Sequence, residues 1–254
     1  MSQEAVMGAE AAEAQPPYRR VYRRTVTWRV VHWVNVASIV VAAVTGMYIA
    51  NPFYAAKAPF VMAWNRAAHL YAAIVLDVSI ILIAYLYFFS RAEREARHLR
   101  PTRKNILELQ EAFLNVVMLG RRKRFDSSQL DPLNVLFFTL LHVMIVFQLL
   151  TGLQLYVYGM ESGISSVGSW WPTLMHFATD WTVPAFGGIG RVRLVHHFML
   201  YPIVGWAILH IYYEIWRTVM WKEGDINIMF GGDKFARRGP NEAAVRDSAG
   251  RGEP

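Results

Sequence analysis

Apolar residues gather in four long stretches that are separated by blocks of charged residues. The stretches cover residues 30–50, 67–89, 133–157 and 194–221, and each is near or above the ~20 residues that a helix needs to cross a bilayer core. Inside lipid, a helix satisfies its own backbone hydrogen bonds. The pattern therefore predicts an all-α polytopic membrane protein built as a bundle of four transmembrane helices.

The segments at the two ends of the chain have a different composition. Residues 1–17 are rich in Ala, Glu and Pro, without the basic and apolar regions of a signal peptide, and residues 231–254 are rich in Gly and Arg. Both are expected to be disordered cytoplasmic tails around a membrane domain at 18–230. A short amphipathic helix is expected around Ile106–Leu119, along the cytoplasmic face.

Basic residues predict the orientation of the bundle. They precede the first span, fill the link between the second and third, and follow the fourth, whereas the links 51–66 and 158–193 carry few of them. By the positive-inside rule, both termini are cytoplasmic and these two links face outward, which makes the chain a multi-pass protein of the cytoplasmic (inner) membrane. The net charge of +7 is explained by topology and by contact with membrane lipids rather than by nucleic acid.

The outer link 158–193 contains Trp170, Trp171 and Trp181. These residues fit an aromatic belt at the membrane interface and equally a docking surface for an external partner. The sequence leaves both interpretations open.

The chemistry of the spans lies in their histidines. The chain has 8 His and no Cys, so it holds no thiolate-ligated iron–sulfur cluster, no c-type haem and no disulfide. We call His69 and His196, near the outer ends of their spans, the outer pair, and His32 and His210, near the cytoplasmic ends, the inner pair. Fourteen helical residues advance about 21 Å and rotate close to four turns, so His196 and His210 share a face, while His197 is turned by about 100°.

Two imidazoles from facing helices can ligate one haem iron, and a bis-histidine haem suits electron transfer because it has no open coordination site. Zinc would need three or four ligands at one point, which two separate levels do not offer. A hydrogen bond between helices is the alternative role for any single membrane histidine, and it is the expected role of His142, which has no partner at its depth. His98 and His176 lie in links and are expected to face solvent.

Three arginines are candidates to pair with haem propionates: Arg29 at the inner level, and Arg191 and Arg193 at the outer level. Pairing with lipid headgroups is equally consistent with their positions. The helix glycines Gly46, Gly152 and Gly205 can admit a flat macrocycle or another helix.

Two acids lie within the spans, and an acid inside the membrane is a candidate functional residue. Glu214, one turn after His210, is a candidate for proton delivery to a quinone and also for pairing with Arg217. Asp77, near mid-membrane, is expected to hydrogen-bond a neighbouring helix. The functional roles of Asp77 and His142 stay undetermined.

Two segments resemble those of a known family. They are RVVHWVNVASIVVAAVTG (Arg29–Gly46), with Arg-x-x-His-Trp and a closing Thr-Gly, and RLVHHFMLYPIVGWAILH (Arg193–His210), with a His-His pair and a closing His. Both resemble segments of the b-type cytochrome subunit of membrane-bound nickel–iron hydrogenases. The resemblance covers all four spans and extends to NIMFGGDKF (Asn227–Phe235).

The resemblance implies two b haems, one ligated by the outer pair and one by the inner pair. It implies small and large hydrogenase subunits on the outer face, with electrons passing from the iron–sulfur clusters of the small subunit to menaquinone or ubiquinone. The chain would then carry out electron transfer within a hydrogen:quinone oxidoreductase complex. Two alternatives remain: the cytochrome b subunit of another outward-facing dehydrogenase, such as formate dehydrogenase, and a haem-free membrane anchor or transporter.

Overall fold

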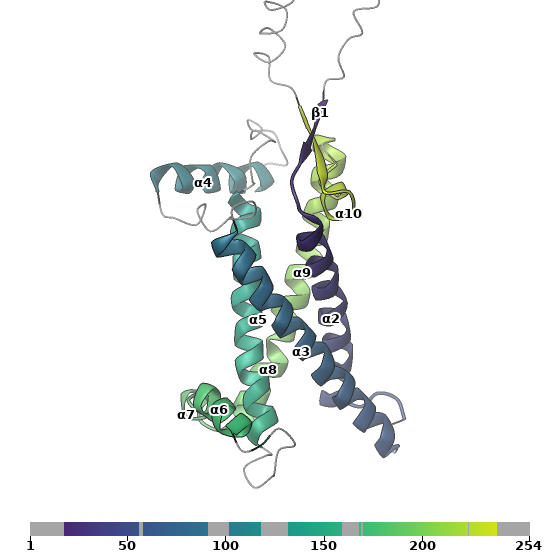
Figure 1. Cartoon of the computed structure of the whole chain (residues 1–254), viewed down its shortest axis with the longest axis vertical. Coiled ribbons are helices and arrows are strands. Elements are labelled where there is room, and N and C mark those ends of the chain that lie inside the picture. Colours follow the sequence, from purple (N-terminus) through teal and green to yellow (C-terminus); the bar gives the residue numbers. More distant parts are fainter. Residues whose placement is uncertain are drawn as a thin grey trace, which may run out of the picture.

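Four long helical spans form the body of the protein. The computed structural model describes residues 18–55, 58–90, 102–117, 132–158, 168, 170–222 and 224–237. The spans are α2 (Val26–Ala50), α3 (Pro59–Phe89), α5 (Pro132–Tyr158) and a fourth composed of α8 (Ile189–Phe198) and α9 (Leu200–Trp221). In the described part of the chain, these four are the helices that are long and apolar enough to cross a membrane. The predicted all-α architecture is confirmed (Figure 1).

Local sequence signals extend the helices beyond their apolar stretches. The side chain of Thr25 caps α2 by accepting a hydrogen bond from the Trp28 backbone N–H at 3.3 Å. Helix α3 begins at Pro59, where the ring fixes a helical φ and the missing N–H costs no hydrogen bond. Helices α2 and α3 therefore start before residues 30 and 67, the starts predicted from hydropathy alone.

The fourth span is interrupted, which the sequence pattern did not predict. Met199 separates α8 from α9. Pro202 has no N–H to donate to the Phe198 carbonyl four residues earlier, so the regular hydrogen-bond ladder is broken at this turn. The continuous helix expected at 194–221 is thus two helices, with His196 on α8 and His210 on α9.

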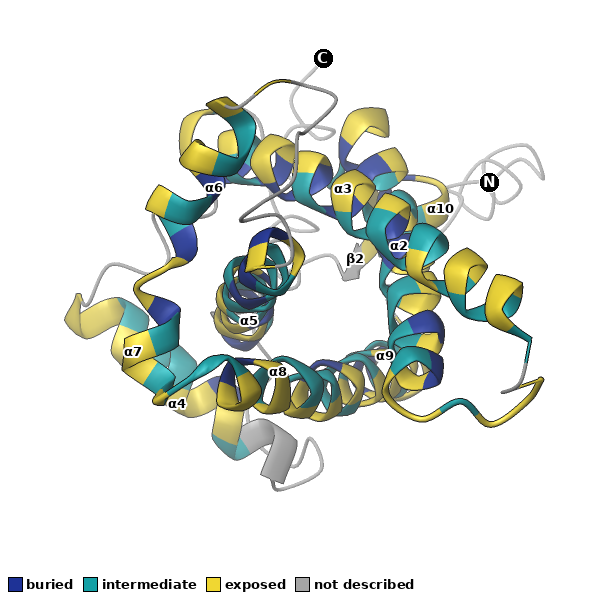
Figure 2. Cartoon of the chain, turned by 90° about the horizontal axis from the view of Figure 1, so that it is seen from below, coloured by how far each residue is buried: buried dark blue, intermediate teal, exposed yellow. Residues whose placement is uncertain are grey.

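The interior of the bundle is apolar and draws on several spans. At mid-length, Leu76 and Ile80 of α3 pack with Leu141 and Ile145 of α5 and with Ile203 of α9. In the view along the bundle, α5 lies inside a ring formed by the other helices, and the exposed residues of the long helices lie largely on outward faces (Figure 2). Such apolar outward surfaces suit a helix bundle surrounded by lipid.

A two-stranded ribbon joins the two ends of the described chain. Strand β1 (Tyr18–Tyr22) pairs antiparallel with β2 (Asp233–Arg237), so that Tyr18 lies opposite Arg237. The Arg20 guanidinium donates a hydrogen bond to Asp233, and this bond together with the negative charge raises the pKa of Arg20. The prediction of a disordered tail at 231–254 is therefore wrong for residues 231–237, because backbone pairing with a distant strand orders them.

The ribbon is fixed to the helices by a short helix and a turn. Helix α10 (Asn227–Phe230) contacts α2: the Trp33 indole donates to the Met229 carbonyl at 3.0 Å, and Arg29 donates to the Phe230 carbonyl. Gly232 follows with φ +85°, and a Cβ there would lie 2.9 Å from the Arg24 carbonyl oxygen. Glycine is therefore required at this turn.

A buried group of charges lies at the same end; we call Arg217, Asp225 and Lys234 the ionic cluster. Asp225 Oδ1 is 2.8 Å from Lys234 Nζ and 3.1 Å from an Arg217 guanidinium nitrogen. The three residues are at most 5% exposed. The cluster joins the end of α9 to β2, and its charges stabilise one another because they are paired away from water.

Helix α4 (Arg103–Val117) lies at the end of the bundle that carries the ribbon (Figure 1). It is amphipathic, as predicted for Ile106–Leu119, although Leu119 lies outside the described residues. At the opposite end are α6 (Trp170–Thr179) and α7 (Thr182–Phe186).

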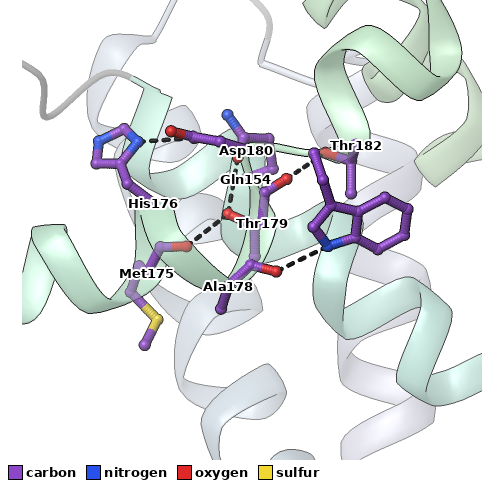
Figure 3. A network of polar contacts seen from close by, with 8 residues as sticks. Gln154, Met175, His176, Ala178, Thr179, Asp180 and Thr182 are labelled. Carbon is purple, nitrogen blue, oxygen red and sulfur yellow. Dashed lines mark hydrogen bonds and ion pairs between the residues drawn. The ribbon is translucent and has the colours of Figure 1, made fainter.

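Helices α6 and α7 are held on α5 by a buried polar network (Figure 3). Thr179 Oγ1 lies 2.7 Å from Gln154 Oε1 of α5 and 2.8 Å from the Met175 carbonyl, while Thr182 donates to the Thr179 carbonyl at 2.7 Å. His176, expected to face solvent, is 2.8 Å from Asp180 Oδ1. The link between the third and fourth spans therefore includes ordered helices at this end.

Candidate functional site

The rings of the outer pair lie close together near the α6–α7 end. The ring centroids of His69 (α3) and His196 (α8) are 6.3 Å apart, with their planes at 74°. Two imidazoles on opposite sides of one metal, with bonds of about 2 Å from ring nitrogens about 1 Å off the ring centre, have centroids about 6 Å apart. The observed spacing therefore fits two axial ligands of a single iron.

The ring of His69 is oriented by helix α2. Its Nδ1 lies 2.9 Å from the Ala42 carbonyl oxygen and 3.1 Å from Thr45 Oγ1. A carbonyl oxygen only accepts, so Nδ1 carries the proton and Nε2 presents its lone pair. A neutral imidazole with a bare Nε2 is the form that ligates a metal.

The ring of His196 is oriented by helix α5. Its Nδ1 is 3.0 Å from Thr151 Oγ1, whose hydroxyl lies within reach of the Phe147 carbonyl at 3.0 Å and the Gln148 carbonyl at 3.1 Å. Since the hydroxyl proton is directed to a carbonyl, the oxygen accepts from Nδ1–H. The side-chain amide nitrogen of Gln148 is 3.3 Å from Nε2 of His196 and can donate a hydrogen bond to the lone pair on that nitrogen.

The two histidines of the inner pair lie on different helices, His32 on α2 and His210 on α9. The His32 ring packs edge-on against Trp33 at 5.4 Å, and the His210 ring stacks on Trp206 at 4.9 Å with 13° between the planes. Each inner histidine therefore has a tryptophan of its own helix as an aromatic neighbour.

The two histidines of the fourth span both have neighbours on helix α5. His196 faces Thr151 of α5, and His210 lines a small apolar cavity together with residues from the start of α5. The cavity is lined by Asn134, Phe137, Trp206, Leu209, His210 and Tyr213. Despite the break at Met199, both histidines of the fourth span are therefore directed toward α5.

The three arginines proposed for propionates have different surroundings. Arg29 donates to the Phe230 carbonyl, and its buried Nε has no hydrogen-bond partner among the described residues. Arg191 and Arg193 are exposed at the end where the outer pair lies. Arg29 thus has a buried donor next to the turn at Gly232, whereas the other two side chains are exposed.

The contact of Glu214 corrects one expectation. Its Oε1 accepts a hydrogen bond from Asn134 Nδ2 at 2.7 Å, beside the cavity next to His210. Arg217, the partner expected from sequence spacing, binds Asp225 instead. The partner of Glu214 lies 80 residues away in the chain, so helical spacing had no means of indicating it.

The remaining histidines are spread over several environments. His142 Nδ1 donates to the Phe138 carbonyl of its own helix at 2.6 Å, and its buried Nε2 has no partner in the described part of the chain. His197 is half-buried with its ring centroid 6.1 Å from that of His196. Asp77 is half-buried within α3, and His98 lies outside the described residues.

Sequence reasoning missed the residues that hold the ligands in place. Thr45, Thr151 and Gln148 contact the outer pair, and Asn134 holds Glu214. One signal was present: the dipeptide Thr-Gly occurs in both α2 and α5. Its meaning depends on which helix packs opposite, which the pattern alone does not contain.

The donor set fits haem better than a compact metal site. No group of three or more His, Asp or Glu side chains converges within the described ranges, as a structural zinc site would require. The outer pair instead offers two neighbouring imidazoles whose Nδ1–H groups are hydrogen-bonded, and two such histidines could hold one haem iron.

Comparison with known proteins agrees with this geometry. The sequence profile of the prokaryotic cytochrome b561 family matches residues 23–232. A probable Ni/Fe-hydrogenase B-type cytochrome subunit of Cupriavidus necator is 28% identical over 218 residues, covering 80% of this chain and 82% of the relative. A protein of the same name from Azotobacter vinelandii is 26% identical over 234 residues, covering 88% and 93%. The chain, with its four spans and opposed histidines, belongs to the prokaryotic cytochrome b561 family.

Proposed function

We propose that this chain is the membrane-anchoring cytochrome b subunit of a nickel–iron hydrogenase, and that it passes electrons from the small-subunit iron–sulfur clusters through two bis-histidine b haems to the quinone pool. The observation that carries the proposal is the spacing of the outer pair, 6.3 Å between ring centroids. The names of the relatives support the hydrogenase partner over formate dehydrogenase. Bound haem supplies reversible one-electron transfer without an open coordination site.

The residues of the chain hold and orient the two groups. His69 and His196 would ligate the outer haem through Nε2, because both Nδ1 atoms are occupied by helix α2 or α5. His32 and His210 would ligate the inner one, and Arg29, whose buried Nε has no hydrogen-bond partner among the described residues, would donate to a propionate. Fourteen residues of helix separate the levels by about 21 Å, which spans most of a bilayer core.

The cavity beside His210 is our proposed quinone site. Its lining of Phe137, Trp206, Leu209 and Tyr213 is apolar, and Asn134 provides a polar group at its edge. The cavity is about 20 Å³ in volume, room for one water molecule, so a quinone ring would bind there only after these side chains move apart. Glu214, bonded to Asn134 at 2.7 Å, is placed to exchange the proton that quinone reduction requires. Menaquinone and ubiquinone both fit this chemistry.

The orientation of the bundle completes the proposal. The basic residues around the ribbon and α4 predict that this end is cytoplasmic in a multi-pass inner-membrane protein, with both termini inside. The α6–α7 end then faces outward, where Trp170 (56% exposed), Phe177 (87%) and Trp181 (51%) are available to the hydrogenase subunits or to the membrane interface.

The direct test is a reduced-minus-oxidised visible spectrum of the purified protein, combined with haem quantitation. We expect low-spin b-type bands and two haems per chain. Replacing His196 by Ala should remove the outer haem and replacing His210 by Ala the inner one, whereas His142→Ala should keep both. A protein without low-spin bands would be a haem-free anchor or transporter, and the proposal would be wrong.

The partner is tested in membranes that contain the intact complex. Addition of hydrogen should reduce the b haems, and affinity purification through this chain should recover a nickel–iron large subunit. Reduction by formate and not by hydrogen would assign the chain to a formate dehydrogenase instead.

The quinone site is tested by Glu214→Gln in the complex. Glutamine can keep the bond to Asn134 while losing the ionisable carboxylate, so hydrogen-dependent haem reduction should remain and the following quinone reduction should slow by tenfold or more. The matched control is Asp180→Asn at the α6–α7 end, the opposite end of the bundle from the cavity, which should leave the rate of quinone reduction unchanged. An unaltered quinone rate in Glu214→Gln would remove this residue from the proposed site.

A further inference from the structure

The same dipeptide contacts each histidine of the outer pair. Thr45–Gly46 of α2 faces His69, and Thr151–Gly152 of α5 faces His196. We call these two dipeptides the Thr-Gly seats. In each, the threonine oxygen lies 3.0 or 3.1 Å from Nδ1 and the glycine lies against the ring carbon Cε1 of the same histidine. Two unrelated helix contacts therefore have the same arrangement.

The threonine of each seat is held in an accepting role. Thr45 donates its proton to the Val41 carbonyl at 2.6 Å, and Thr151 donates to carbonyls one turn earlier, at 3.0 Å and 3.1 Å. The hydroxyl oxygen that remains can only accept from the histidine Nδ1–H. Each seat thus fixes the imidazole tautomer and directs Nε2 away from its own helix.

The glycine of each seat is explained by the ring and not by the backbone. Neither Gly46 nor Gly152 is among the described glycines with positive φ, so an alanine would fit both helices. An added Cβ would, however, lie 3.1 Å from His69 Cε1 at Gly46 and 3.0 Å from His196 Cε1 at Gly152. The missing side chain allows the imidazole to approach closely enough for the hydrogen bond to its Nδ1.

We infer that the two Thr-Gly seats position the imidazoles of the outer pair and, through the hydrogen bonds to Nδ1, set the reduction potential of the iron between them. The inference rests on the proposed function, since it concerns the haem held by His69 and His196. A hydrogen bond from Nδ1–H to an acceptor increases electron donation by Nε2, which stabilises the ferric state. Thr45 and Thr151 are positioning residues that act through the ligands.

Each histidine of the outer pair also has a backbone partner beside its threonine. The Nδ1 of His69 lies 2.9 Å from the Ala42 carbonyl, and the ring of His196 has a backbone hydrogen bond with Gln148. Loss of either threonine hydroxyl should therefore weaken the hydrogen bonding of the ring without releasing it.

The test compares Thr45→Val, Thr151→Val and Thr151→Ser in the complete complex. The measurements are haem content per chain and the midpoint potential of each haem from a spectroscopic redox titration. We expect both valine variants to raise the midpoint potential of one haem. Thr151→Ser should keep the original potential because the serine hydroxyl can occupy the same position.

Each result bears on the inference. A loss of one haem in Thr151→Val that Thr151→Ser restores also supports a role of the hydroxyl. Equal loss of haem in both variants, or full haem content with unchanged potentials in both valine variants, would overturn it. If Thr151→Val is not recovered from the membrane, Thr45→Val alone decides, since the Ala42 carbonyl still holds His69. Absence of low-spin haem from the unsubstituted protein would refute the proposed function itself, before any variant is compared.

Discussion

Replacing Gly152 by Ala tests the packing at the outer pair with a single methyl group. The new Cβ would lie 3.0 Å from His196 Cε1, below the ordinary contact range that begins at 3.4 Å. The ring or the helix must therefore move by a few tenths of an ångström, and overpacking of this kind costs about 1–3 kcal/mol. The higher helix propensity of alanine offsets up to about 1 kcal/mol of this cost.

The displacement also affects the hydrogen bond to Thr151, which precedes Gly152 on the same helix. This bond is 3.0 Å long, and moving the ring away stretches it toward the limit of a useful hydrogen bond, at a loss of about 1 kcal/mol. We expect a net weakening of about 1–2 kcal/mol in the holding of the outer haem, which is roughly a tenfold loss of affinity.

The assay is haem occupancy per purified chain at limiting haem supply, read from the low-spin bands of the reduced protein. The matched control is Gly190→Ala. Gly190 lies on α8, the helix that carries His196, and a Cβ there meets nothing within 4 Å. Full occupancy and unchanged spectra in Gly152→Ala would refute the steric argument. Equal losses in both variants would show that the effect comes from the helices rather than from the ring.

Two further predictions concern groups outside the outer pair. Asp225→Asn removes the buried carboxylate that Arg217 and Lys234 share, so we expect the free energy of unfolding to fall by about 3–5 kcal/mol. Thermal unfolding in detergent measures this loss, and Asp180→Asn, which alters an exposed pair, is the control. An unfolding midpoint of Asp225→Asn no lower than that of Asp180→Asn would contradict the prediction. His142→Leu removes a buried Nε2 that has no partner in the described structure. We therefore expect full haem content and a free energy of unfolding that is unchanged or higher by about 1 kcal/mol. Loss of a haem would instead give His142 a role in haem binding.

Much of the architecture follows from the sequence because the membrane restricts the possible structures. Each apolar stretch had to form a helix, and the helical period placed His196 and His210 on one side of the fourth span. Both histidines are directed toward α5, even though Pro202 interrupts the ladder between them. The levels of His32 and His69 followed in the same way from their distance to the ends of their spans.

Only the tertiary structure decided which groups meet across the bundle. From the sequence, Gly46 and Gly152 could equally be helix-packing residues. In the structure, they lie against the rings of His69 and His196. Glu214 has its partner on another helix, at Asn134, and residues 233–237 become a strand because residues 18–22 lie beside them. The sequence by itself determined the helices and the position of each histidine along its span, since both depend on local hydrophobicity and the helical repeat. The tertiary structure decided the hydrogen bonds that orient the imidazoles of the outer pair, since these join segments whose separation along the chain says nothing about their distance in space.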